Sequence, residues 1–237
     1  MAEDSANTTG ATSSEPSHLE MMAFVAGLRV DRIIDVYIGK NTDACQIPES
    51  TLINTSPVFV KALQHQHLGG DPPDTLRFPD DNAGSWIMLL WWKAKGNVPT
   101  PRCNFRTETF VQAWIMGDKY DIKDFQDDLM LEIIVHLETN VLDLRTAKLA
   151  FENTVPGSPL RTLMAEELAD QVRQEDGAKG FQEIFSMFEG VVGFTAEVVE
   201  ALDTYENCGK DNLKKERSKQ HLARFMVGDG PRRRSVQ

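Results

Sequence analysis

The sequence predicts an α+β fold, a small three-stranded sheet with clustered α-helices, followed by an all-α C-terminal extension. Two segments read as strands, because Ile33 to Ile38 is rich in β-branched residues and Thr75 to Phe78 alternates in polarity. A helix is predicted by the strongest four-residue repeat in the chain, formed by Phe125, Leu129, Ile133 and Leu137. After Glu138 the pattern is helical throughout, which favours an extension made of helices alone.

The segment between the two strands is compact. Asn41-Thr42-Asp43 has turn composition, and Cys45 to Pro48 reads as a further short strand. Two short helices are expected before Leu63. The second opens on Ser56-Pro57, where serine can cap the helix and proline occupies the first helical position without losing a hydrogen bond.

Three longer helices follow the last strand. The first is capped by Asp81 or Asn82 and runs to about Lys93, and its apolar residues cover every side, so we expect it to be buried all round. The next begins at Thr107. Asp121 is expected to cap the third.

The extension is expected to hold several helices. They cover about Val141 to Asn153, Leu160 to Arg173, and a phenylalanine-rich stretch from Phe181 to Leu202 broken at Gly190 or Gly193. The chain is thereby divided into a disordered leader (1–20), a first domain (21–138), the helical extension (139–209) and a basic tail (210–237), which we expect to be disordered.

The composition predicts neither a membrane-spanning segment nor a signal peptide. No apolar run approaches the roughly 20 residues needed to cross a bilayer, and the first 17 residues lack the apolar core of a signal peptide. Three cysteines far apart in the sequence indicate free thiols and a reducing intracellular compartment. The sequence does not distinguish the nucleus from the cytoplasm.

Charge is distributed unevenly. Of the net charge of −11, the tail from Lys210 contributes nine basic against three acidic residues, a local +6, so the preceding chain carries −11 − 6 = −17. An acidic body disfavours nucleic acid as the main partner, because phosphate binding needs a cationic face.

Several local motifs resemble those of the BTB/POZ family. The order strand, strand, two helices, strand, buried helix and two amphipathic helices is similar to that fold across about Arg32 to Glu138. The motifs that carry the resemblance are Asp35-Val36, Leu52-Ile53 with Ser56-Pro57-Val58-Phe59, Leu76-Arg77-Phe78-Pro79-Asp80-Asp81, and Trp114 to Ile122 with Gly117 in place of the family's alanine. The helices continuing through Ser158-Pro159-Leu160-Arg161 look most like BTB proteins of fungi. Two departures are Pro48-Glu49 where the family has His-Lys, and Trp92 to Gly96 where it has Tyr-Thr-Gly.

Residues with reactive side chains do not form an active site in the sequence. His65 and His67 face different sides of a helix and lack a third ligand, and Cys45 beside Ile47 reads as a buried thiol. The adjacent acids Asp127-Asp128 and Glu166-Glu167 are expected on solvated faces. We therefore expect no enzyme, no cofactor, no metal and no small-molecule substrate.

The leading hypothesis is a protein-interaction module that forms homodimers or a scaffold. The resemblance implies self-association through the segment before the first strand and the first helix, which maps to Leu28, Ile33, Leu52 and Ile53; the alternative is that all four are core residues. Trp91-Trp92 is expected to be core, with one of the pair open to an interface.

Two further hypotheses concern partners. The resemblance also implies a cullin-dependent ubiquitin-ligase adaptor, ranked lower because Lys93 to Thr107 is basic where family adaptors carry a glutamate. A transcription-associated nuclear protein is the other alternative, with the basic tail as an import signal. The candidate signal residues are Lys214, Lys215, Arg232, Arg233 and Arg234.

Overall fold

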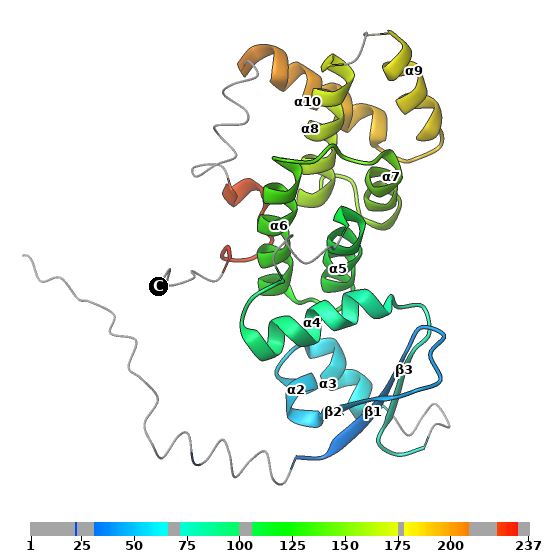
Figure 1. The fold of residues 1–237 in the computed structure, drawn as a ribbon, viewed down its shortest axis with the longest axis vertical. Coiled ribbons are helices and arrows are strands. Elements are labelled where there is room, and N and C mark those ends of the chain that lie inside the picture. Colours follow the sequence, from blue (N-terminus) through cyan, green and yellow to red (C-terminus); the bar gives the residue numbers. More distant parts are fainter. Residues whose placement is uncertain are drawn as a thin grey trace, which may run out of the picture.

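The computed structural model describes residues 22, 31–65, 72–99, 106–174, 178–208 and 222–231. They form an elongated body with a small sheet and two short helices at one end and a group of helices at the other, and helix α4 lies across the body between them (Figure 1). The predicted α+β class with a three-stranded sheet is confirmed.

The sheet has the strand order β2-β1-β3. Strand β1 (Ile33–Ile38) pairs antiparallel with β2 (Cys45–Pro48) and parallel with β3 (Thr75–Phe78). Alternate β1 residues are buried, because successive side chains of a strand point to opposite faces. Ile34 lies opposite Ile47 and Val36 lies beside Leu76, so all three strands give apolar side chains to one face.

Two short helices, α2 (Glu49–Ile53) and α3 (Pro57–Gln64), follow β2. Ser56 caps α3 as expected: its hydroxyl accepts a hydrogen bond from the Val58 amide at 3.0 Å and donates one to the Tyr120 carbonyl. The cap therefore also ties α3 to a residue 64 positions later in the chain.

Helix α4 (Ala83–Lys95) is capped by Asn82, whose side chain accepts from the Ser85 amide at 3.1 Å. Gly96 ends it in the left-handed conformation, at φ 69°. The expectation that α4 is buried on all sides is wrong, because Ile87 and Trp91 are exposed. A helix that is apolar on every side stays partly exposed when the neighbouring elements cover only some of its sides.

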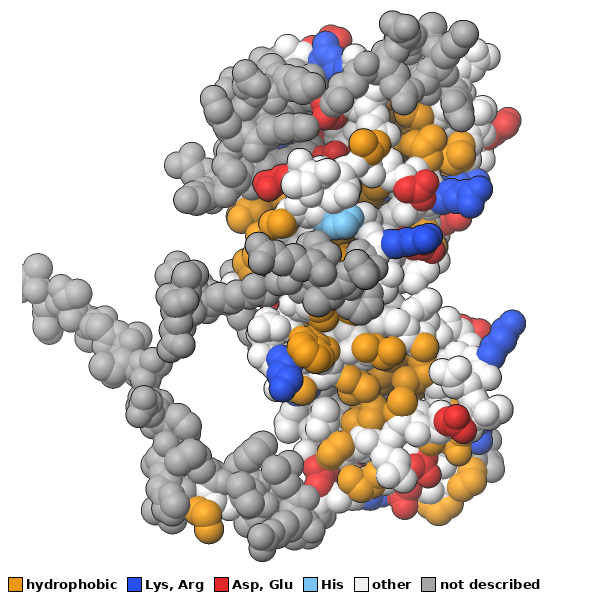
Figure 2. All heavy atoms as spheres, in the orientation of Figure 1, with side chains coloured by type: hydrophobic (Ala, Val, Ile, Leu, Met, Phe, Trp, Pro, Cys, Tyr) orange, Lys and Arg blue, Asp and Glu red, His pale blue; other side chains and the backbone are white. Residues whose placement is uncertain are grey.

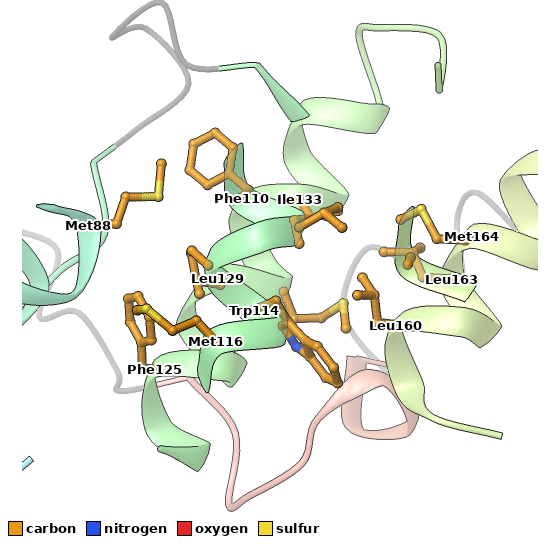
Figure 3. Packing of buried hydrophobic residues seen from close by; sticks show 14 of the residues in the cluster. Met88, Phe110, Trp114, Met116, Phe125, Leu129, Ile133, Leu160, Leu163 and Met164 are labelled. Atoms are coloured by element: carbon orange, nitrogen blue, oxygen red, sulfur yellow. The ribbon is translucent and has the colours of Figure 1, made fainter. Parts of the chain in front are cut away.

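Helices α5 (Thr107–Lys119) and α6 (Lys123–Leu137) pack against each other. The four-residue repeat predicted for α6 is confirmed, since all four of its members are buried. Figure 3 shows Phe125, Leu129 and Ile133. The prediction that Asp121 caps α6 is wrong, because Ile122 is the residue that precedes the helix and no side chain caps it. Asp121 adopts φ 52° and ends α5, where the Ile122 amide bonds the Gly117 carbonyl at 2.9 Å.

The extension contains α7 (Leu144–Asn153), α8 (Pro159–Gln174), α9 (Ala178–Met187) and α10 (Phe194–Cys208). Its helices were predicted, although α7 begins three residues later than expected because Asp143 caps it. The break between α9 and α10 occurs at Gly190 and Gly193, which both have positive φ.

Helix α8 is held by a buried arginine. The Arg161 guanidinium donates to Glu197 on α10 at 3.1 Å and to the carbonyls of Thr154 and Val192, and it lies 4.7 Å from the Phe151 ring. A buried charge needs this many partners to offset the loss of water. Arg161 thereby fastens α8 to α10, to the loop before α8 through Thr154 and to the loop before α10 through Val192.

Buried apolar residues form one continuous cluster from Ile34 to Ala201, so the core does not divide at Glu138. A 3₁₀ turn, η2 (Leu222–Phe225), adds Phe225 to this cluster. The tail expected to be disordered from residue 210 is therefore packed over residues 222–231. Among the described residues, no helix is long and apolar enough to span a bilayer.

Gly117 allows α5 and α6 to approach closely. A Cβ atom at this position would lie 2.7 Å from Cγ of the buried Gln126. Gly117→Ala is therefore expected to destabilise the protein by about 1 kcal/mol, because overpacking costs about 1–3 kcal/mol and exceeds the gain in helix propensity of about 1 kcal/mol.

Urea unfolding would measure the change. In a Gln126→Ala background the cost of Gly117→Ala should be smaller, because the atom that clashes is gone. A Gly117→Ala protein at least as stable as wild type would contradict this account of the α5–α6 contact.

Candidate interaction surface

Helix α4 carries an apolar stripe on its outer side. Ile87 is 62% exposed and Trp91 47% exposed, and Ala94 is also exposed. Ala83 and Leu90 lie half-buried beside them. These five positions recur at the spacing of one helix face, so the exposed side chains form one stripe, named here the α4 stripe.

Hydrophobic side chains gather on the same half of the molecule. Figure 2 shows them over the region of α3 and α4, with few charged side chains among them. Val58 and Ala62 on α3 and Phe78 on β3 are partly buried apolar residues of this half. Lys95 lies at the edge of the stripe, with Nζ 5.8 Å from the centre of the Trp91 ring.

The orientation of α4 is set on its inner side. Trp86 Nε1 donates to Asp81 at 2.7 Å, and Trp92 Nε1 donates to Asp128 on α6 at 2.7 Å. Trp92 is 2% exposed, so the two adjacent tryptophans have opposite roles. Consecutive residues on a helix point about 100° apart, which allows Trp92 to be core and Trp91 to be surface.

Asp81 joins the start of α4 to the end of α5. Its carboxylate accepts from Trp86 of α4, from the Tyr120 hydroxyl at 2.6 Å and from Lys119 Nζ at 2.7 Å. Burial, the hydrogen bond to Asp81 and the charges of Asp81 and Asp80 raise the pKa of Tyr120 far above its usual value of 10. The phenol therefore stays protonated and keeps donating.

An aromatic cluster surrounds this network. The Phe59 ring lies 5.3 Å from Trp86 and 4.8 Å from Tyr120, and Phe78 lies 5.0 Å from Trp86. Rings at such distances attract one another beyond the area they bury. Helices α3 and α4, strand β3 and the end of α5 therefore pack together through these rings.

The interface residues inferred from the resemblance have different environments. Ile33 and Ile53 are exposed, at 46% and 45%. Leu52 is 1% exposed, so its assignment to an interface is wrong: it packs into the core and is closed to a partner. Leu28 lies outside the residues that the structure describes.

Ile33 and Ile53 lie at the same end of the sheet. The first turn of α2 is tied to the start of β1, since the Glu49 amide donates to the Arg32 carbonyl at 2.8 Å and the Ser50 amide donates to Asp31 at 3.1 Å. Ile33 follows Arg32 directly and Ile53 ends the five-residue helix α2. We name this pair the β1–α2 edge.

The reactive residues of the sequence are dispersed. Cys45 is exposed, so the expectation of a buried thiol is wrong: β2 is an edge strand of the sheet, and Ile47 is its one buried residue. His65 ends α3 at the surface and His136 is half-buried, while His67 is outside the described residues. Within the described ranges, no group of three His, Cys, Asp or Glu side chains could hold a metal ion.

The prediction that both acidic pairs lie on solvated faces is wrong. Asp127 is fully buried, and Glu166 and Glu167 are nearly so, whereas both pairs were expected on solvated faces. Adjacent acids on a helix give no sign of burial unless the element that covers them is known. Their partners include residues about 60 to 100 positions later in the chain.

A hollow of about 480 Å³ opens beside Asp81, between the start of α4 and helices α5 and α7. Its wall mixes polar groups such as Gln112 and Asn153 with apolar ones such as Ile115 and Leu149. Both Asp81 oxygens already accept hydrogen bonds from the chain, which accounts for this buried carboxylate as a structural group.

The candidate import-signal residues, Lys214, Lys215, Arg232, Arg233 and Arg234, lie outside the described residues. The chain matches no protein-family model and no curated protein.

The adjacent tryptophans provide a matched pair of variants. Trp92→Ala should lower the free energy of unfolding by about 3–5 kcal/mol, because it empties a buried site and removes the donor to Asp128. Trp91→Ala should change it by no more than about 0.5 kcal/mol, as for other exposed positions. Equal losses in urea unfolding would show that the α4 stripe is part of the core.

Proposed function

We propose that this protein is an interaction module of the BTB/POZ type, which acts by binding other polypeptides and by self-association rather than by catalysis. The observation that carries the proposal is the α4 stripe, an exposed row of apolar side chains with a tryptophan in it. Soluble proteins seldom expose continuous apolar patches unless a partner covers them.

The BTB/POZ assignment is supported by the element order. The chain runs strand, strand, two short helices, strand, long helix and two packed helices, which is the order that the resemblance implies. The quoted motifs fall at structural junctions: Ser56 is a cap, Asp80-Asp81 follow β3, and Trp114 to Ile122 spans the turn from α5 to α6. The quoted motifs therefore lie at positions where the fold needs a helix cap or a turn.

The two surfaces suit different partners. Trp91 has the size and amphipathic character of a binding hot spot, and Ile87 lies one turn before it, so the α4 stripe suits an apolar surface on another protein. The β1–α2 edge is the position where the resemblance implies contact between copies. Self-association is therefore assigned to Ile33 and Ile53, and partner binding to Ile87 and Trp91.

Self-association can be tested directly. We expect the wild-type protein to be a dimer at tens of micromolar in size-exclusion chromatography with light scattering. Ile33→Ser/Ile53→Ser should shift it to monomer, because both changes remove exposed apolar contact area. Val141→Ser, at an exposed valine in the loop before α7, is the matched control and should leave the dimer intact.

A wild-type protein that is strictly monomeric at that concentration would refute self-association. A dimer that persists in the double variant and dissociates in Ile87→Ser/Trp91→Ser would move the contact to the α4 stripe.

Partner binding has its own experiment. The tagged Ile87→Ser/Trp91→Ser protein should lose the proteins that the wild type retains in quantitative interaction mass spectrometry, by at least about tenfold, since hot-spot truncations cost 2 kcal/mol or more. Ile33→Ser/Ile53→Ser is the control and should retain them. An unchanged set of retained proteins would count against the α4 stripe as a binding surface.

A further inference from the structure

Helices α6 and α8 bury an unusual number of acidic side chains. Asp127 on α6 is fully buried, and Glu132 on α6 and Glu166, Glu167 and Asp170 on α8 are each less than a tenth exposed. A carboxylate away from water is costly unless hydrogen-bond donors or cations surround it. Segment 222–231 donates hydrogen bonds to two of these carboxylates, Asp127 and Glu166.

Asp127 is held by backbone amides of the C-terminal segment. Its carboxylate accepts from Val227 at 2.6 Å, from Gly228 at 3.1 Å and from Gly230 at 2.9 Å. Successive amides directed at one anion form a concave site that favours negative charge, and hydrogen bonds to an ionised acceptor are the stronger kind. Here the anion belongs to the body of the protein and the amides to the segment.

Both glycines suit this arrangement. A Cβ atom on Gly228 would lie 3.1 Å from Asp127 Oδ2 and 3.3 Å from Cβ of Lys123. Gly230 has φ 98°, which residues with a side chain rarely adopt. The sequence Val-Gly-Asp-Gly is thus adapted to close contact with α6.

Two side chains add to the amide contacts. Phe225 is 0% exposed and belongs to the core cluster, and the segment that carries it runs past Trp114 and Leu160 (Figure 3). Arg224 donates to Glu166 on α8 at 3.0 Å and lies 4.5 Å from the Phe225 ring. The segment therefore contacts the body in the way a bound peptide does, with an aromatic anchor, an ion pair and backbone hydrogen bonds.

We propose that the surface of α6 and α8 that residues 222–231 cover, named here the α6–α8 groove, is a peptide-binding site, and that these residues are its ligand in cis. The segment has an arginine-phenylalanine pair followed by a turn that contains two glycines. It belongs to a tail that has nine basic residues against three acidic ones. The acidic body and basic tail are complementary in charge. Since α6 precedes Glu138 and α8 belongs to the extension, the docked segment also fastens the extension to the helices before it.

Tethering accounts for occupancy of the site. Thirteen residues, 209 to 221, connect the end of α10 to the segment. A short tether gives its ligand an effective concentration on the order of millimolar, so a free peptide at micromolar concentration cannot compete. Weakening the cis segment should therefore open the groove to the same sequence in trans.

The test uses the full-length chain and a dye-labelled synthetic peptide with the sequence of residues 222–231, measured by fluorescence anisotropy. Wild type should bind the peptide at least tenfold more weakly than Phe225→Ala, because only the variant has lost its cis anchor. Adding Asp127→Asn to Phe225→Ala should abolish binding, whereas adding Asp128→Asn, one position along α6, should not. A peptide with alanine at the phenylalanine position should fail to bind any of them.

Hydrogen exchange provides a readout that does not depend on the peptide. In wild type the amides of Val227, Gly228 and Gly230 should be protected, and Asp127→Asn should speed their exchange at least tenfold while α5 amides are unchanged. Unprotected amides in wild type, no peptide binding by Phe225→Ala, or binding that is indifferent to Asp127→Asn would each overturn the proposal.

Discussion

The hydrogen bonds of one buried carboxylate determine what this protein presents to its surroundings. Asp81 accepts from Trp86, Tyr120 and Lys119, and so fixes the start of α4 against the end of α5. At the other end of α4, Trp92 bonds Asp128. Two indole donors on the inner side of one helix set its rotation, and with it the outward position of Ile87 and Trp91. The α4 stripe is thus a consequence of polar contacts made on the opposite face.

Buried charge recurs through the molecule. Arg161 ties α8 to α10, Asp81 ties α4 to α5, and Asp127 and Glu166 hold segment 222–231. Each of these groups is surrounded by donors or counter-charges from elements distant in the sequence. Isolated burial of such groups would be destabilising, so these contacts specify one arrangement of the helices more than they add to stability.

The proposed functions use separate parts of the surface. The β1–α2 edge and the α4 stripe lie on the sheet-bearing half, whereas the α6–α8 groove lies at the junction with the extension. Binding of a partner on α4 need not displace the C-terminal segment. The three proposed binding events therefore do not compete for the same surface.

The sequence by itself determined most of the elements, because their signals are local. The β-branched run of β1, the Ser56 cap and the repeat along α6 each depend on residues a few positions apart, and all three were predicted. The sequence also predicted that one of the two adjacent tryptophans, Trp91 and Trp92, is open to an interface, since neighbouring residues on a helix point in different directions. Only the tertiary structure decided which of the two is exposed.

Burial of Leu52 and Asp127, and exposure of Cys45, likewise depend on what the rest of the chain places above each residue. The docked tail is the extreme case. Its partner Asp127 is 100 residues away from Val227, and a basic, glycine-containing segment has the local composition of a disordered end. Long-range complementarity of this kind leaves no periodicity in the sequence, and only the folded chain brings its two parts together.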